Sequence, residues 1–311
     1  KKESRIVIWT NCPELALYAE LFNTTNPNVD AVIVYKKNPE ESLPPKKDEL
    51  PPDIIIGNNL LSEKLHKNYK PLDYLFSHKI LSSEMFYTEL LNSGKNNSSQ
   101  YLLPISFNLP AIIFANTNKS FVEDKYTISL EQLRTTSAKF NKKNKKGNFE
   151  KIGFTPLSNE DFLYLSTKLN EVNFKNENNK ITWDDEKLTQ TLNFFKDWAS
   201  TENSSIQEEL DFAIKYLFMP NYRQVSSERT LFAYTTSDEL FKNMKNMDLD
   251  IDYRWLSNGK FIPIEDPITM LGLYKYSKKQ AEATEFITWF FSSKTQDTLL
   301  SRKAEIMLNT S

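Results

Sequence analysis

The side chains that most often carry out chemistry are scarce in this chain of 311 residues. His66 and His78 are the only histidines, and Cys12 is the only cysteine. A zinc site of His and Cys ligands, or a nucleophile with a histidine base, therefore has few residues from which it could be built. None of the six glycines lies in a G-x-G-x-x-G or G-x-x-x-x-G-K-[ST] motif, the motifs that bind nucleotide phosphates. We expect no catalytic residue, no metal site and no cofactor.

Pairs of acidic residues are the remaining source of catalytic groups. Asp184-Asp185 and Glu265-Asp266 could supply the two carboxylates that a glycosidase holds about 5–10 Å apart. Acids that are adjacent in a sequence rarely face one site, so a glycosidase is the less favoured interpretation.

The charge balance gives little reason to expect a nucleic-acid partner. The chain has 39 Lys and Arg against 41 Asp and Glu, a net charge of −2. The basic run at 141–148 has no interleaved aromatic residues, which indicates a solvated loop rather than a docking patch. We expect no nucleic-acid partner and a monomer.

Short apolar segments alternate with helical patterns along the chain. The pattern predicts strands at 5–9, 31–35, 53–56, 111–116, 152–156 and 230–234. It predicts helices at 15–25 and 159–170, and a core-facing aromatic stripe of Phe194, Phe195 and Trp198 on another helix. Strands that alternate with helices indicate parallel sheets covered on both faces.

Several segments share sequence patterns with one family of binding proteins. They are the opening IVIWTNCPELALYAELFN followed by Asn26-Pro27, the x-P-D-[IV] strand at Pro51-Pro52-Asp53, and the proline-broken stretch 101–116 with Phe114 and Asn116. The segment ERTLFAYTTSDEL at 228–240 and the helix pattern A-x-x-F-[IL]-x-[FW]-[LF]-x-[ST]-x-x-x-Q, from Ala283 to Gln296, follow in the same order. In these segments the chain resembles extracellular solute-binding proteins of the maltose-binding, family 1 type.

The resemblance implies an α/β, two-lobed periplasmic-binding-protein-like fold of class II. Each lobe would be a mostly parallel sheet flanked by helices, and crossing hinge strands would join the lobes. Lobe 1 would hold residues 1–107 plus 264–300, lobe 2 residues 111–260 plus 301–311, and the hinge crossovers would lie near 104–111 and 260–266. Ligands of open α/β sheets bind at the carboxyl ends of the strands.

The expected ligand contacts therefore lie in loops at strand ends and at the crossovers. They are Trp9, Thr10, Asn11, Glu14, Asn58, Asn59, Ser106, Phe107, Asn108, Thr155, Ser158, Tyr234, Thr235, Thr236, Glu265 and Asp266. Their amide and carboxylate oxygens suit sugar hydroxyls, and an aromatic face suits the C–H side of a sugar ring, although a peptide or a polyamine could use the same groups.

Structural roles remain open for some of these residues. Trp9 could instead pack in the strand core, Asn58-Asn59 could form a turn, and Glu265-Asp266 could form a solvated bend. A lone cysteine such as Cys12 is most often a small buried apolar group.

The function that the resemblance implies is that of a receptor. It would bind a small solute, most readily a sugar or oligosaccharide, by hinge closure and deliver it to the ABC permease subunits in the membrane. We expect an extracytoplasmic protein, anchored by a lipid, because the polar start looks like a tether. The alternative is a surface lipoprotein with the same fold whose cleft has degenerated and which acts in adhesion or protein interaction.

Overall fold

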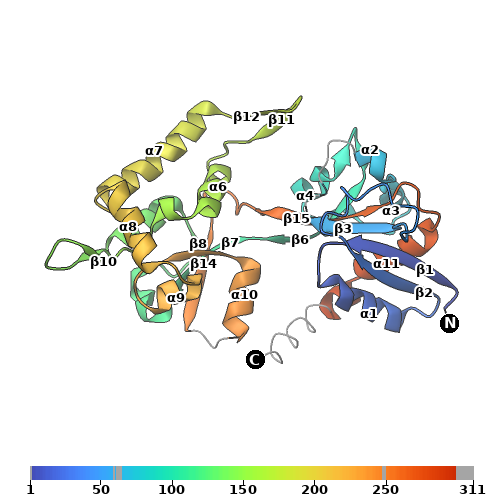
Figure 1. Ribbon diagram of the computed structural model, residues 1–311, viewed down its shortest axis with the longest axis horizontal. Helices are drawn as coiled ribbons and strands as arrows, with labels where there is room; N and C mark the ends of the chain where they lie inside the picture. The colour runs from blue at the N-terminus through green and yellow to red at the C-terminus, as the bar shows by residue number, and fades with distance from the viewer. Residues whose placement is uncertain (1, 59, 61–64, 247–249, 299–311) are drawn as a thin grey trace. The chain divides into compact units, whose positions relative to one another are not determined.

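The computed structural model describes residues 2–58, 60, 65–246 and 250–298. These residues divide into two compact units (Figure 1). Unit 1 holds residues 2–107 and 266–298, and unit 2 holds residues 108–265. The expected placement of residues 301–311 in the second lobe lies outside the described residues, as does Asn59. A hinge at the two passages between the units stays a prediction.

Unit 1 is built on a five-stranded sheet with the order β2-β1-β3-β15-β6. The strands are β1 (Ser4–Thr10), β2 (Val29–Tyr35), β3 (Ile54–Asn58), β6 (Leu102–Asn108) and β15 (Glu265–Leu273). β1 runs parallel to β2 and β3, so the carboxyl ends of these three strands meet at one edge of the sheet. β15 is antiparallel to β3, and its residue Thr269 lies opposite Asn58 at that edge.

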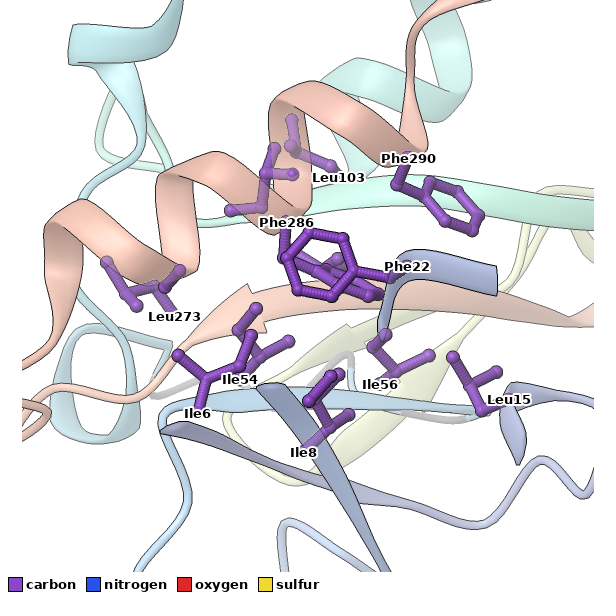
Figure 2. Close-up of a cluster of buried hydrophobic side chains, with 14 of the residues drawn as sticks. Ile6, Ile8, Leu15, Phe22, Ile54, Ile56, Leu103, Leu273, Phe286 and Phe290 are labelled. Atoms are coloured by element: carbon purple, nitrogen blue, oxygen red, sulfur yellow. The ribbon is translucent and has the colours of Figure 1, made fainter. Parts of the chain in front are cut away.

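The core of unit 1 lies between this sheet and two helices, α1 (Leu15–Thr25) and α11 (Gln280–Phe290). Figure 2 shows the rings of Phe22 and Phe286 over the side chains of the sheet. These two rings meet edge to face with centroids 5.1 Å apart, and both are fully buried. Burial of such a side chain stabilises the fold by roughly 1.5–3 kcal/mol, so these rings hold α11 against α1.

Shorter elements complete unit 1. They are α2 (Leu65–Asn68), α3 (Asp73–Ser77), the 3-10 helix η1 (Ser83–Met85), α4 (Thr88–Ser93), and the hairpin of β4 (Lys95–Asn96) and β5 (Ser99–Gln100).

Unit 2 has a four-stranded sheet with the order β13-β7-β14-β8. The strands are β7 (Pro110–Ala115), β8 (Thr127–Ile128), β13 (Ala233–Thr236) and β14 (Ile251–Leu256). The sheet is mixed: β7 is antiparallel to β13 and β14, and only β14 and β8 pair in parallel. The expectation of a mostly parallel sheet is wrong here, because a fully buried strand such as β7 has the same apolar sequence in either direction.

The helices of unit 2 pack around this sheet. They are α5 (Leu130–Ala138), α6 (Glu160–Leu169), α7 (Asp185–Thr201), α8 (Ile206–Tyr216), α9 (Asn221–Ser226) and α10 (Ser237–Asn246), with the 3-10 helix η2 (Asn116–Phe121). On α7, Phe195 and Trp198 are fully buried and Phe194 packs against them, so the predicted core stripe is confirmed. Two hairpins, β9 (Lys142–Lys143) with β10 (Phe149–Lys151) and β11 (Lys175–Glu177) with β12 (Lys180–Thr182), also belong to this unit.

The strand predicted at 152–156 does not form. β10 ends at Lys151, and the chain runs as a loop into the 3-10 helix η3 (Pro156–Ser158). The backbone of Gly153 donates to Asn141 Oδ1 at 2.7 Å and accepts from Leu231 N and Phe232 N at 3.1 and 2.9 Å. Because the Asn141 side chain and the backbone of residues 231–232 occupy the hydrogen-bonding groups of Gly153, the pairing of β10 does not continue past Lys151.

Candidate functional site

Unit 2 contains a cavity of about 350 Å³, which we name the unit 2 cavity. Its walls come from the loop at 154–160, from α8 and α9, and from the start of β13. Three of the predicted contacts lie in these walls: Thr155, Ser158 and Tyr234. A volume of this size falls in the range of small-molecule sites.

The turn at 155–158 presents two hydroxyl groups to the cavity. The hydroxyl oxygens of Thr155 and Ser158 lie 2.6 Å apart, and Ser158 Oγ also donates to the Thr155 carbonyl at 2.9 Å. Asn159 follows directly and begins α6, because its Oδ1 accepts from Phe162 N at 3.0 Å. The turn is therefore fixed on one side by the helix that it starts.

A buried acid fixes the other side of the turn. Glu209, on α8, is fully buried, and its two carboxylate oxygens accept from Leu157 N at 3.0 Å and from Asn203 Nδ2 at 2.7 Å. Asn203 Nδ2 also donates to the Phe154 carbonyl at 3.0 Å. Burial raises the pKa of Glu209 to about 7, although both hydrogen bonds act in the opposite direction.

Two hydroxyls in the walls have no partner within the described residues. Thr230 Oγ1 and the Tyr234 hydroxyl are both buried and make no hydrogen bond. A buried polar group without a partner costs about 1–3 kcal/mol, so native structures seldom keep one without a reason. Both residues line the cavity, and their hydroxyl oxygens lie beneath its surface rather than on it.

Apart from Glu160, the rest of the lining is neutral or apolar. Ile214 is 70% exposed and Phe218 is 93% exposed, and both contribute to the cavity. Glu160 is the only charged side chain among the residues that line it. The cavity thus offers neutral hydrogen-bonding groups and an aromatic face.

Unit 1 carries a separate group of polar residues, the polar edge, formed by Thr10, Asn11, Asn58 and Thr269. Asn11 Oδ1 accepts from Asn58 N at 3.1 Å, and Thr269 Oγ1 donates to Asn58 Oδ1 at 2.7 Å. Thr10 Oγ1 accepts from Cys12 N at 3.0 Å. The carboxyl ends of β1 and β3 are therefore linked through side chains, and Asn11 and Asn58 remain half-buried.

Cys12 lies beside the polar edge and is buried, in agreement with the packing interpretation. Burial raises the pKa of its thiol. A thiol that stays protonated at neutral pH is a poor nucleophile, so this cysteine is unsuited to covalent chemistry.

Trp9 is enclosed by the core of unit 1. Its side chain is fully buried, and Nε1 donates to the Leu50 carbonyl at 3.1 Å. Lys36 Nζ lies 4.6 Å from the ring centroid. These contacts favour the packing interpretation over a stacking platform for a solute. Glu14, by contrast, is exposed just before α1.

The remaining predicted residues do not line the unit 2 cavity. Ser106 is exposed, and Phe107 meets Tyr87 edge to face at 5.4 Å. Asn108 Oδ1 accepts from Ser237 Oγ at 2.9 Å and so holds the start of α10.

Near that helix start, Thr236 Oγ1 donates to Asp238 Oδ1 at 2.6 Å, and Thr235 is buried. Glu265 is buried at the start of β15, and the side chain of Asp266 lies outside the described residues.

Several residues of the two sites were not among the predicted contacts. Thr230, Asn221 and Gln224 line the cavity, and Thr269 belongs to the polar edge. Gln224 also closes the turn between α8 and α9, since its Nε2 donates to the carbonyls of Leu217 and Met219 at 3.2 and 3.0 Å. Only Thr230 carries a signal in the sequence, as a polar residue directly before an apolar segment.

Within the described ranges, His, Cys, Asp and Glu side chains form no group of three that could hold a metal ion. Among the helices of those ranges, none is long and apolar enough to cross a membrane.

A comparison with protein families identifies the family of this chain. The profile of a family described as bacterial extracellular solute-binding protein matches residues 14–297. A search of curated proteins gave no match.

Solved structures match the chain over nearly its whole length. The maltose-binding protein MalE of Listeria monocytogenes with maltose is 14% identical, with a TM-score of 0.66 over 99% of this chain and 78% of that one. The GacH receptor of Streptomyces glaucescens, studied with acarbose, is 15% identical, with a TM-score of 0.62 over 99% and 80%. CpMnBP1 with mannotriose is 17% identical, with a TM-score of 0.66 over 94% and 79%. These matches confirm the expected α/β fold of two-lobed binding proteins.

Proposed function

Because the chain belongs to the bacterial extracellular solute-binding protein family, we propose that it is the receptor of an ABC importer for a sugar or oligosaccharide. It would bind the solute outside the cytoplasm and deliver it to a membrane permease. The similar structures were solved with maltose, acarbose and mannotriose, which supports a sugar.

The observation that carries this proposal is the neutral, hydrogen-bonding lining of the unit 2 cavity, with the hydroxyl pair of Thr155 and Ser158 in one wall. The hydroxyls of Thr155 and Ser158 can both donate and accept, as sugar hydroxyls do. The exposed ring of Phe218 would cover the C–H face of a sugar ring.

The charges of the lining favour a sugar over the two other candidate solutes. A polyamine would call for several carboxylates, and the cavity has only that of Glu160. A peptide would place a carboxylate terminus in the site, and no Lys or Arg lines the cavity to receive it. A neutral ligand fits these walls best.

We propose that the polar edge of unit 1 supplies further hydrogen bonds and that ligand contacts with both units drive hinge closure. Asn11 and Asn58 have half-buried amide groups, and Glu14 has an exposed carboxylate near them in the sequence. We also propose a lipid anchor, which mass spectrometry of the native protein would detect as an added acyl mass. No reaction is assigned to the solute.

The test is thermal unfolding of the purified protein against mono- and oligosaccharides, with amino acids, peptides and polyamines as controls. A solute at 100 times its Kd stabilises the native state by about 2.7 kcal/mol, so a specific sugar should raise Tm clearly. The comparison variant is S158A, which removes an exposed hydroxyl from the cavity wall and should lose part of the shift. A flat response to the whole panel, confirmed by calorimetry, would instead favour a surface lipoprotein with a degenerate cleft.

A further inference from the structure

Glu209 is the only buried acid that reaches the wall of the unit 2 cavity among the residues that the structure describes, and the proposed function gives it no role. We propose that Glu209 is a positioning residue that fixes the turn at 154–158 and makes solute binding in this cavity depend on pH near neutrality. The binding part rests on the proposed function, whereas the positioning part does not.

Glu209 contacts the turn directly at Leu157 and, through Asn203, at Phe154. One carboxylate oxygen accepts from Leu157 N, and the other accepts from Asn203 Nδ2, which also reaches the Phe154 carbonyl. Asn203 is fixed in turn, because its Oδ1 accepts from Asn141 Nδ2 at 3.0 Å. The walls formed by Phe154, Thr155, Leu157 and Ser158 therefore depend on one carboxylate.

Burial is the main cause of the raised pKa of Glu209, and no neighbouring charge contributes to it. The 3-10 helix η3 carries no charged residue. Among the charged side chains of the packed elements, Asp197 on α7 and Glu202 directly after α7 pair with Arg134 of α5, and Glu208 on α8 lies 3.8 Å from Lys143 of β9. The raised pKa of Glu209, about 7, puts its titration in the neutral range.

Protonation weakens the hold on the turn. The ionised carboxylate is purely an acceptor and satisfies both N–H donors, whereas the neutral acid presents an O–H to one of them. A solute that needs the turn in place therefore binds the ionised form better. Affinity should rise with pH through about 7.

The first experiment measures Kd for the best sugar of the panel by calorimetry between pH 6 and pH 8. If the complex lowers the pKa of Glu209 by one to two units, binding at pH 6 is roughly five- to tenfold weaker than at pH 8. The variant E209Q should bind weakly at every pH and lose the slope, because its amide offers one acceptor oxygen where the carboxylate offers two. The control E208Q, on the same helix, should keep the wild-type profile.

Binding to the wild type that does not change between pH 6 and pH 8, or a slope that persists in E209Q, would overturn the pH dependence and leave the proposed function intact. Absence of sugar binding at any pH would count against the proposed function alone.

The second experiment needs no ligand. In NMR spectra of the free protein, the backbone amide signal of Leu157 and the side-chain amide of Asn203 should titrate together with a midpoint near pH 7. Both titrations should vanish in E209Q and persist in E208Q. If the Leu157 signal does not change with pH in the wild type, Glu209 does not position the turn.

Discussion

The hydroxyl of Tyr234 does not stabilise the free protein, because it is buried and lacks a hydrogen-bond partner within the described chain. Its ring, in contrast, packs against Phe162 with centroids 5.7 Å apart. The substitution Tyr234→Phe removes the hydroxyl and keeps the ring. We expect the free energy of unfolding to stay the same or rise by up to about 1 kcal/mol, and the affinity for the solute to stay within about twofold, because the hydroxyl has no accessible surface with which to contact a solute.

Urea denaturation and calorimetry on the same preparation measure the two effects. Tyr253→Phe is the matched control, since Tyr253 is a half-buried tyrosine in a different hydrophobic cluster of unit 2. A loss of stability in Tyr234→Phe would show that the hydroxyl has a structural partner after all.

Cys12 gives a second prediction at the level of one residue. Its thiol is 4% exposed and has a raised pKa, so both access and thiolate fraction are low. A disulfide reagent at pH 8 should modify native Cys12 at least about 100-fold more slowly than the unfolded chain. In a C12S background, Ser77→Cys, at an exposed position on α3, should react fast. Rapid modification of the native wild type would mean that the polar edge opens readily.

At the level of elements, the loop that carries Thr155 depends on the small size of Gly153. A Cβ atom at Gly153 would lie 2.0 Å from the backbone oxygen of Ser137, at the end of α5. Backbone cannot yield as a side-chain tip can, so Gly153→Ala should lower the free energy of unfolding by about 3 kcal/mol or more.

Gly147→Ala is the matched control. At Gly147 a Cβ has open space, and only its positive φ of 82° disfavours alanine. The cost should be about 1 kcal/mol. Urea denaturation of both variants gives the comparison, and equal effects would contradict the close packing of the loop on α5.

The same elements show what the sequence could predict. Strand β1 and helix α1 follow from local pattern, since Ile6 and Ile8 form a buried apolar run and Leu15, Ala19 and Phe22 recur at helical spacing. The direction of β7 and the loop at 152–155 do not, because they depend on partners more than 70 residues away, such as Leu231 and Tyr253.

The candidate site was predictable where it follows a strand or precedes a helix. Thr155 and Ser158 come before α6, and Tyr234 lies in β13. The order of predicted strands and helices along the chain was therefore enough to select these residues. The sequence could not decide the role of Trp9, because successive strand residues point to opposite faces of the sheet and the pattern does not say which face is enclosed. Glu209 left no signal, since only tertiary packing distinguishes it from the half-buried Glu208 beside it.

For the whole molecule, the buried acid links global stability to pH. The folded-state pKa of Glu209, about 7, lies above its ordinary value of 4.5, so the native state holds a proton that the unfolded state has lost between these values. Its contribution is therefore complete below pH 4.5 and declines as pH rises through about 7, by up to about 3 kcal/mol.

Denaturation of E209Q and wild type from pH 5 to pH 8 measures this contribution. The difference between their free energies of unfolding should change with pH, with the wild type losing more stability toward pH 8. This trend is opposite to the expected rise in sugar affinity, so general destabilisation cannot account for both. Parallel curves would show that Glu209 does not titrate in this range.

The order of the chain through the two units has a consequence for biosynthesis. Unit 2 is one continuous stretch, whereas unit 1 needs β15 to pair with β3 and α11 to pack on Phe22, and both come from the far end of the sequence. As the polypeptide leaves the ribosome, unit 2 can complete its sheet while the first 107 residues still wait for their last strand and helix. In a ribosome-stalled chain of which residues up to about 265 have emerged from the exit tunnel, unit 2 should thus resist proteases. Proteases should still cleave unit 1 in the same chain. Until the final segment emerges, β3 keeps an open edge that a chaperone or a neighbouring nascent chain could pair with.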